Sequence, residues 1–237
     1  MFSIKEAIVF GWKTLRKHSG LMLGVVLTLF ALQVMTDIVE RTLQGTATGF
    51  AASIMLGIVG VVLGCGATLI SLKLAKGEAA QYRDIVPDIK TVWRYFCSSF
   101  LSGLIAALPL MAGGFVAFII LAATGSISFS EGPWQGSPAA VAVAVVIMAV
   151  ALAATIYLAL RYSMARMAVL EEGEIIGSIR RSTTLTRDRI GHLFLFVLAL
   201  IGINILGLLV LVVGLLVSVP VSMLAFAHVY LKLKARG

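Results

Sequence analysis

One short segment concentrates the residue types that could do chemistry. Arg161–Gly191 holds six arginines, three glutamates and one aspartate. It lies between two apolar blocks, Gly132–Leu160 and Ile190–Leu231, which contain no Asp, Glu, Lys or Arg. A charged segment between two such blocks is either a reactive site at a membrane surface or the connection between two membrane spans.

The carboxylates of this segment allow two interpretations. Glu171, Glu172 and Glu174, beside Arg161 and Arg166, could form a cluster for general acid–base catalysis. The same residues could form a salt-bridged joint between a membrane span and a helix on the membrane surface. We favour the joint, and we expect Arg161 or Arg166 to pair with the acidic group.

Other enzyme signatures are missing. The chain has no HExxH, no GxSxG and no phosphate-binding glycine loop. Its histidines, His18, His192 and His228, have no recognisable metal-ligand spacing, and neither Cys65 nor Cys97 lies in a CxxC motif. We therefore expect a protein that is not an enzyme and that uses no metal and no cofactor.

The composition indicates a membrane protein that is entirely α-helical. Hydrophobic residues make up 60% of the 237 residues and charged residues 13%, and the mean hydropathy is +1.04. A helix needs about 20 apolar residues to cross a bilayer. At 1.5 Å per residue the last block, 42 residues long, makes about 63 Å of helix, which is two crossings with a turn near Gly214. Six spans are predicted from the charge-free runs Leu21–Thr36, Thr42–Leu72, Tyr95–Ser130, Gly132–Leu160 and Ile190–Leu231.

The basic residues predict the orientation. With six spans, 18 of the 19 lysines and arginines fall on one side of the membrane, and only Arg41 falls on the other. Because basic residues are enriched in cytoplasmic segments, we expect a multi-pass protein of the bacterial inner membrane with both termini in the cytoplasm.

Three charged segments have helical amphipathic patterns typical of helices at a membrane surface. The N-terminal one begins with a capping box, Ser3 to Glu6. The others cover Tyr82–Phe96 and the residues after Glu174. Each precedes two spans, which predicts one helical domain over residues 1–237 built from three units of surface helix and hairpin, approximately 1–75, 79–170 and 174–234.

In the third surface helix the apolar face carries isoleucines and Ser182, opposite a basic face. We expect the residues of this segment to form the structural joint or to face lipid head groups: Arg161, Arg166, Glu171, Arg180, Arg181, Ser182 and Arg187.

Inside the spans two polar residues stand out, Gln33 and Asn204. They could bond neighbouring helices or contact a substrate. Gly60 and Gly64 have the small-residue spacing that lets helices approach closely, so we expect Gly64→Leu to force the second span away from its neighbour.

The charged segment also resembles a known group. Arg161-Tyr-Ser-x-Ala165, Leu170-Glu171 and Ile179-x-Arg181-Ser182-x-x-Leu185-x-Arg187 are similar to bacterial YciC-like integral membrane proteins and to the membrane domain of some glycerophosphoryl diester phosphodiesterases. The resemblance implies a six-helix inner-membrane protein in which Arg161, Glu171 and Ser182 are structural. Because the phosphodiesterase activity belongs to a separate soluble domain, we do not expect it here.

The function that we expect is non-enzymatic. The basic cytoplasmic face would bind anionic phospholipids or organise a protein partner in the membrane, and it would not bind nucleic acid. The alternative is a transporter or channel for a lipid-like or small amphiphilic solute, with Gln33 and Asn204 in its path; an intramembrane enzyme ranks third.

Reporter fusions test the orientation. Fusions after Lys76 and after Arg189 should report the cytoplasm, and a fusion after Glu131 should report the outside, because the basic segments lie on one side. An outside signal from either of the first two fusions contradicts the six-span topology.

Overall fold

The fold is helical throughout the residues that the structure describes. The structure is a computed structural model, and it describes residues 3–125, 137–187 and 189–235. The elements are α1 (Ile4–Lys17), α2 (Ser19–Thr42), α3 (Ala47–Lys76), the 3-10 turn η1 (Tyr82–Ile85), α4 (Ile89–Ala123), α5 (Pro138–Tyr162), α6 (Ala165–Glu172), α7 (Ile175–Thr186), α8 (Ile190–Leu209) and α9 (Leu211–Lys234).

Six helical stretches in the described residues are long and apolar enough to cross a membrane. They correspond to α2, α3, α4, α5 continued by α6, α8 and α9. The prediction of an all-α, multi-pass membrane protein with six spans is confirmed. The loop that holds Glu131 lies outside the described residues.

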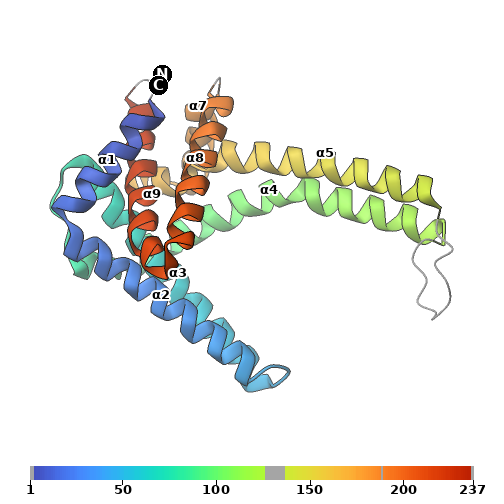
Figure 1. Cartoon of the computed structure of the whole chain (residues 1–237), viewed down its shortest axis with the longest axis horizontal. Helices are drawn as coiled ribbons and strands as arrows, with labels where there is room; N and C mark the ends of the chain where they lie inside the picture. Colours follow the sequence, from blue (N-terminus) through green and yellow to red (C-terminus); the bar gives the residue numbers. More distant parts are fainter. Residues whose placement is uncertain (1–2, 126–136, 188, 236–237) are drawn as a thin grey trace.

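Two helical hairpins leave a common body in different directions (Figure 1). The body contains α1, α7, α8 and α9, and the two chain ends lie side by side on it. The hairpins α2–α3 and α4–α5 reach away from it, and α4 and α5 stay paired along their length. The outer surfaces of these arms carry exposed apolar side chains, which suits contact with lipid; they include Phe30, Met55, Phe115, Val146 and Val150.

Helix α9 is the centre of the body. It packs against α1, α3 and α8, and Leu224, Val229 and Tyr230 on it are fully buried. Two clusters of buried apolar residues meet on it. One joins α9 to α6 and α8, and the other joins it to α2, α3 and η1.

The predicted N-terminal amphipathic helix is confirmed, with Ser3 as its N-cap residue. The Ser3 side chain accepts a hydrogen bond from the Glu6 amide at 3.4 Å, as an N-cap residue does. Ala7, Gly11 and Leu15 are its buried residues, and they share one side of α1.

The second connection differs from the predicted surface helix. Tyr82–Ile85 is one 3-10 turn, and α4 then runs without interruption from Ile89. Pro87 explains the break, because it disfavours a helical conformation in the residue before it, and Asp88 caps α4 by accepting from the Thr91 amide at 3.1 Å. The second unit therefore has a short turn where the other two have a surface helix.

Polar side-chain contacts hold this turn against α2 and α3. Asp84 pairs with Lys73 at 3.0 Å. The hydrogen bond from the Gln81 amide lowers the pKa of Asp84 against a smaller opposing effect of burial, and Lys73 lowers it further. The Tyr82 hydroxyl lies 2.5 Å from the hydroxyl of Thr28 on α2.

The turn between the last two spans falls at Val210, four residues before Gly214, in agreement with a predicted turn near that glycine. Gly214 serves the packing of α8 on α9. A Cβ atom placed on it would lie 2.1 Å from the carbonyl oxygen of Gly207, so the two glycines let the helices touch directly after the turn.

The predicted role of Gly64 is wrong. A Cβ atom at Gly64 would meet nothing within 4 Å, and one at Gly60 would meet only Leu32, at an ordinary 3.5 Å. The close approach on α3 is at Gly66, where a Cβ atom would lie 2.0 Å from the carbonyl oxygen of Ile85. The crowded neighbour is the backbone of η1, and not another span.

We therefore expect Gly66→Ala to lower the free energy of unfolding by about 1–3 kcal/mol, because the new methyl group overlaps backbone that cannot rotate away. Gly64→Ala is the matched control, on the same helix and with open space around it, and it should leave stability unchanged or slightly raised. Thermal unfolding in detergent measures both variants. Equal stability of the two would contradict the packing of η1 on α3.

Candidate functional site

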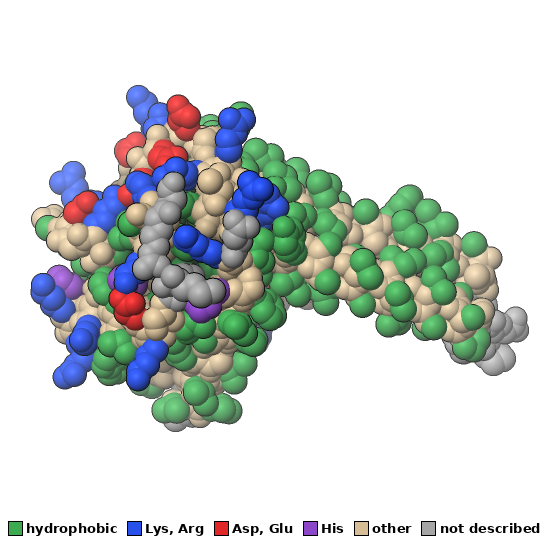
Figure 2. Space-filling view, turned by 90° about the horizontal axis from the view of Figure 1, so that it is seen from above, with side chains coloured by type: hydrophobic (Ala, Val, Ile, Leu, Met, Phe, Trp, Pro, Cys, Tyr) green, Lys and Arg blue, Asp and Glu red, His purple; other side chains and the backbone are tan. Residues whose placement is uncertain are grey.

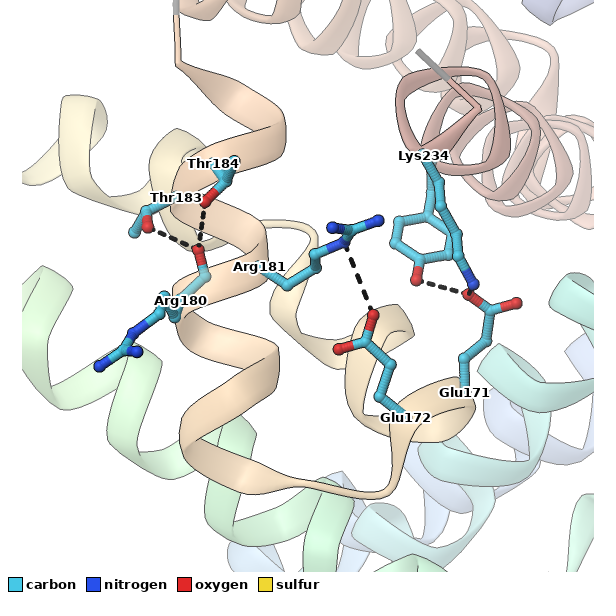
Figure 3. A network of polar contacts seen from close by, with 8 residues as sticks. Glu171, Glu172, Arg180, Arg181, Thr183, Thr184 and Lys234 are labelled. Atoms are coloured by element: carbon cyan, nitrogen blue, oxygen red, sulfur yellow. Dashed lines mark hydrogen bonds and ion pairs between the residues drawn. The ribbon is translucent and has the colours of Figure 1, made fainter. Parts of the chain in front are cut away.

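Glu171 at the end of α6 is held by three side chains, and Figure 3 shows Lys234 beside it. Lys76 of α3 lies 2.5 Å from its Oε1, and Lys234 of α9 lies 2.8 Å from its Oε2. The Tyr230 hydroxyl donates to Oε2 at 2.6 Å. The side chain of Glu171 is only 8% exposed. One buried carboxylate thus connects elements of all three predicted units.

The predicted partner of this carboxylate is therefore wrong. Among the described residues Glu171 pairs with two lysines, and neither Arg161 nor Arg166 forms an ion pair with it. The chain reverses direction at Gly173, whose φ is 71°, and the acidic group is carried to the ends of α3 and α9. The lysines that bind it stand in the last turns of those helices, where basic residues are favoured.

The neighbouring Glu172 makes a weaker contact. Its Oε1 lies 3.6 Å from Nε of Arg181 on α7. Both side chains are about one-third exposed, at 34% and 35%. This pair connects α6 to α7, but solvent weakens the attraction between its two charges.

The predicted salt bridge of Arg161 or Arg166 is not found among the described residues, and hydroxyl groups connect the fourth span to α7 instead. Ser182 and Thr186 of α7 donate to the backbone carbonyl of Arg161, at 2.8 and 3.1 Å. Both are fully buried. The carbonyl lies in the last turn of α5, where the helix offers no amide donor, so α7 supplies the missing hydrogen bonds.

The charged side chains gather on the body and leave the long arm apolar. Figure 2 shows Lys, Arg, Asp and Glu over the body, while the α4–α5 arm is covered by hydrophobic side chains. The end of α1 that carries Glu6 is tied to the end of α9 by its ion pair with Lys232. We call this charged side of the body the basic face; its members that lie in ion pairs include Lys73, Lys76, Arg181, Lys232 and Lys234.

A cavity of about 480 Å³ opens where α5, α7 and α8 meet. Two arginines line it together with hydroxyl groups and one isoleucine: Tyr157, Arg161, Thr183, Thr184, Arg187 and Ile190. The Arg161 guanidinium donates to the Tyr157 hydroxyl at 3.0 Å, which orients it. The described lining thus contains two arginines and no carboxylate.

Its position follows from the joint. Because Ser182 and Thr186 hold α7 on the end of α5, the last turn of α7 places Arg187 beside Arg161. Thr183 and Thr184 both donate to the carbonyl of Arg180, at 2.7 and 3.1 Å. Arg180 itself is exposed and does not line the cavity. Tyr157, Thr183 and Thr184 had not been predicted, because nothing in a single sequence shows that they lie close together.

A second cavity, of about 360 Å³, lies between α3, α6, α8 and α9 and brings Arg166 and Asn204 together. The Asn204 side-chain amide donates to the Leu200 carbonyl at 2.9 Å and to the Ser222 hydroxyl at 3.1 Å. Gln33 does not line this cavity; it donates to Asp37 on its own helix at 3.1 Å.

The described residues hold no group of three or more His, Cys, Asp or Glu that could bind a metal ion. His228 stacks on Phe10 with ring centroids 4.1 Å apart, and Cys65 is buried. Two carboxylates of the charged segment, Glu171 and Glu172, are bound to cations, as described above.

Comparison with known proteins gives one match. A family model described as a protein of unknown function (DUF975) matches residues 5–237. No curated protein and no solved structure matches the chain. The match fits a helical membrane protein, and it does not confirm the resemblance to YciC-like proteins.

We expect Glu171→Gln to lower the free energy of unfolding by about 1.5–3 kcal/mol, because the neutral amide loses the charge-assisted hydrogen bonds to Lys76 and Lys234, whose side chains are one-third exposed. Glu172→Gln removes the same charge from a solvent-screened pair and should cost at most about 1 kcal/mol. Denaturant unfolding in mixed micelles measures both. If the two variants lost equal stability, Glu171 would not be the connection between the units.

Proposed function

Since the chain belongs to the DUF975 family of proteins of unknown function, we propose from its geometry that it binds anionic phospholipids and catalyses no reaction. The lipid head group would sit in the cavity of Arg161 and Arg187. The protein would lie in the bacterial inner membrane with the basic face and both termini in the cytoplasm, where the lysines and arginines are expected.

The cavity between α5, α7 and α8 is the observation that supports this proposal. A phosphodiester oxygen accepts hydrogen bonds and carries negative charge, and two guanidinium groups supply both donors and positive charge. Each arginine near a membrane surface contributes about 1 kcal/mol toward anionic lipid. A cavity of about 480 Å³ lies in the size range of small-molecule sites.

The surroundings of the cavity suit a lipid. It lies at the end of a span, so a bound head group would stay at the level of the other head groups. Tyr157 and Ile190 give it an apolar side, and the outer surface of α5 continues from there with exposed Leu152 and Ile156. Acyl chains can follow that surface into the bilayer without leaving the hydrocarbon.

The basic face can also organise a protein partner in the membrane, and a bound lipid could form part of that contact. The alternative function is transport of a lipid-like or small amphiphilic solute. The cavity beside Asn204 favours this alternative, but Gln33 does not line that cavity and a path through both residues has no support.

Substitution of the two arginines tests the head-group site. In nanodiscs, replacing part of the phosphatidylcholine by phosphatidylglycerol should raise the Tm of the wild-type protein. The double variant Arg161→Gln/Arg187→Gln should lose most of that increase, with a phosphatidylglycerol affinity roughly tenfold or more lower, because two contributions of about 1 kcal/mol are removed.

The control is a double variant that removes the same two positive charges at positions away from the cavity. Lys13 and Arg180 are exposed and do not line it, so Lys13→Gln/Arg180→Gln should keep the increase in Tm. Equal losses in both double variants would mean that the lipid responds to total charge, and the head-group site would be rejected.

A further inference from the structure

We propose that the cavity between α3, α6, α8 and α9 is a second binding site, for an amphiphile with one apolar chain whose anionic head group also carries a hydroxyl group. A lysophospholipid has this chemistry. The site goes beyond the proposed phospholipid site, because the two cavities have no lining residue in common.

The hydroxyl groups of the cavity are acceptors. Each donates its single proton to a backbone carbonyl three or four residues earlier in the chain, at 2.8 Å, so that only lone pairs remain for a ligand. The four residues are Thr68, Ser71, Ser163 and Ser222.

Asn204 adds another acceptor. Its amide nitrogen lies beside two atoms that can only accept, the Leu200 carbonyl and the Ser222 hydroxyl whose proton is already donated. These neighbours fix the orientation of the amide. Oδ1 is therefore the free end, and it is buried without a hydrogen-bond partner among the described residues. An unpaired buried acceptor favours a ligand that brings a donor.

Arg166 provides hydrogen-bond donors and positive charge at the edge of the cavity. It is the one charged residue of the described lining, it is exposed, and it forms no ion pair within the described part of the chain. Its guanidinium offers several donors to an anionic group. The interior of the cavity thus suits a hydrogen-bond donor, and its edge suits an anionic group. The hydroxyl and the phosphate of one glycerol head group supply these two groups.

The rest of the wall is apolar and narrow. It is formed by Met167, Val197, Leu200, Ile201, Met223 and Phe226. At about 30 Å³ for each water-sized group, 360 Å³ holds on the order of a dozen non-hydrogen atoms. That is enough for a head group and the start of one chain. The remaining chain can leave along α8, where Ile201 and Ile205 are exposed.

Native mass spectrometry of the full chain in detergent tests the site with lysophosphatidylglycerol as the probe. Dodecyl methyl phosphate, a phosphodiester anion with one chain and no hydroxyl group, should bind roughly three- to tenfold more weakly, as expected for one lost hydrogen bond. Diacyl phosphatidylglycerol should not compete for the cavity.

Variants locate the binding. Asn204→Leu and Arg166→Gln should each lower the affinity for lysophosphatidylglycerol by roughly three- to tenfold or more. Gln33→Leu is the control, a polar residue of another span that does not line the cavity. Ile201→Trp narrows the cavity from an exposed position and should weaken binding even if Asn204→Leu fails to fold.

Two results would overturn the inference. One is unchanged binding in both Arg166→Gln and Ile201→Trp. The other is loss of lysophosphatidylglycerol binding in Arg161→Gln/Arg187→Gln, which would assign the probe to the first cavity. Binding that survives in that double variant supports the second site, whatever the outcome for phospholipid at the first.

Discussion

The arrangement of the body depends on one buried carboxylate. Glu171 accepts from Lys76, Lys234 and Tyr230, and these donors come from two helices that are far from it in the sequence. A buried charge without partners is costly, so α3, α6 and α9 are held in the one arrangement that satisfies it. The apolar contacts around α9 then close over this end of the body.

The same arrangement creates both cavities. The turn at Gly173 sends the chain from Glu171 and Glu172 into α7, and Ser182 and Thr186 fasten α7 to the end of α5. That contact brings Arg187 to Arg161. The packing of α6 on α9 brings Arg166 to the side of α8 that carries Asn204. Two cavities with different linings therefore arise from the packing of α5, α6 and α7.

Sequence patterns could predict the spans and two of the three amphipathic helices, because these depend on local periodicity and on runs of apolar residues. The membrane spans, α1 and the bend at Gly173 follow from such signals. The partner of Glu171 could not be predicted, since several cations lie near span ends and only the tertiary packing selects between them. Gly64 and Gly66 show the same limit: Gly64 has the spacing for close packing with Gly60, and only the position of η1 shows that Gly66 is the crowded one.

The contacts of α9 have a consequence for the order of assembly. Chains are synthesised from the N-terminus, so the Lys76 contact of Glu171 is available before Lys234 and Tyr230 have been made. The ion pair of Glu6 on α1 forms after an even longer stretch of synthesis, because its partner Lys232 lies 226 residues later. Until α9 arrives, the buried side of α1 has no helix to cover it, and the membrane surface can shelter its apolar residues. The last helix to be inserted is therefore the one that completes the contacts made by the first.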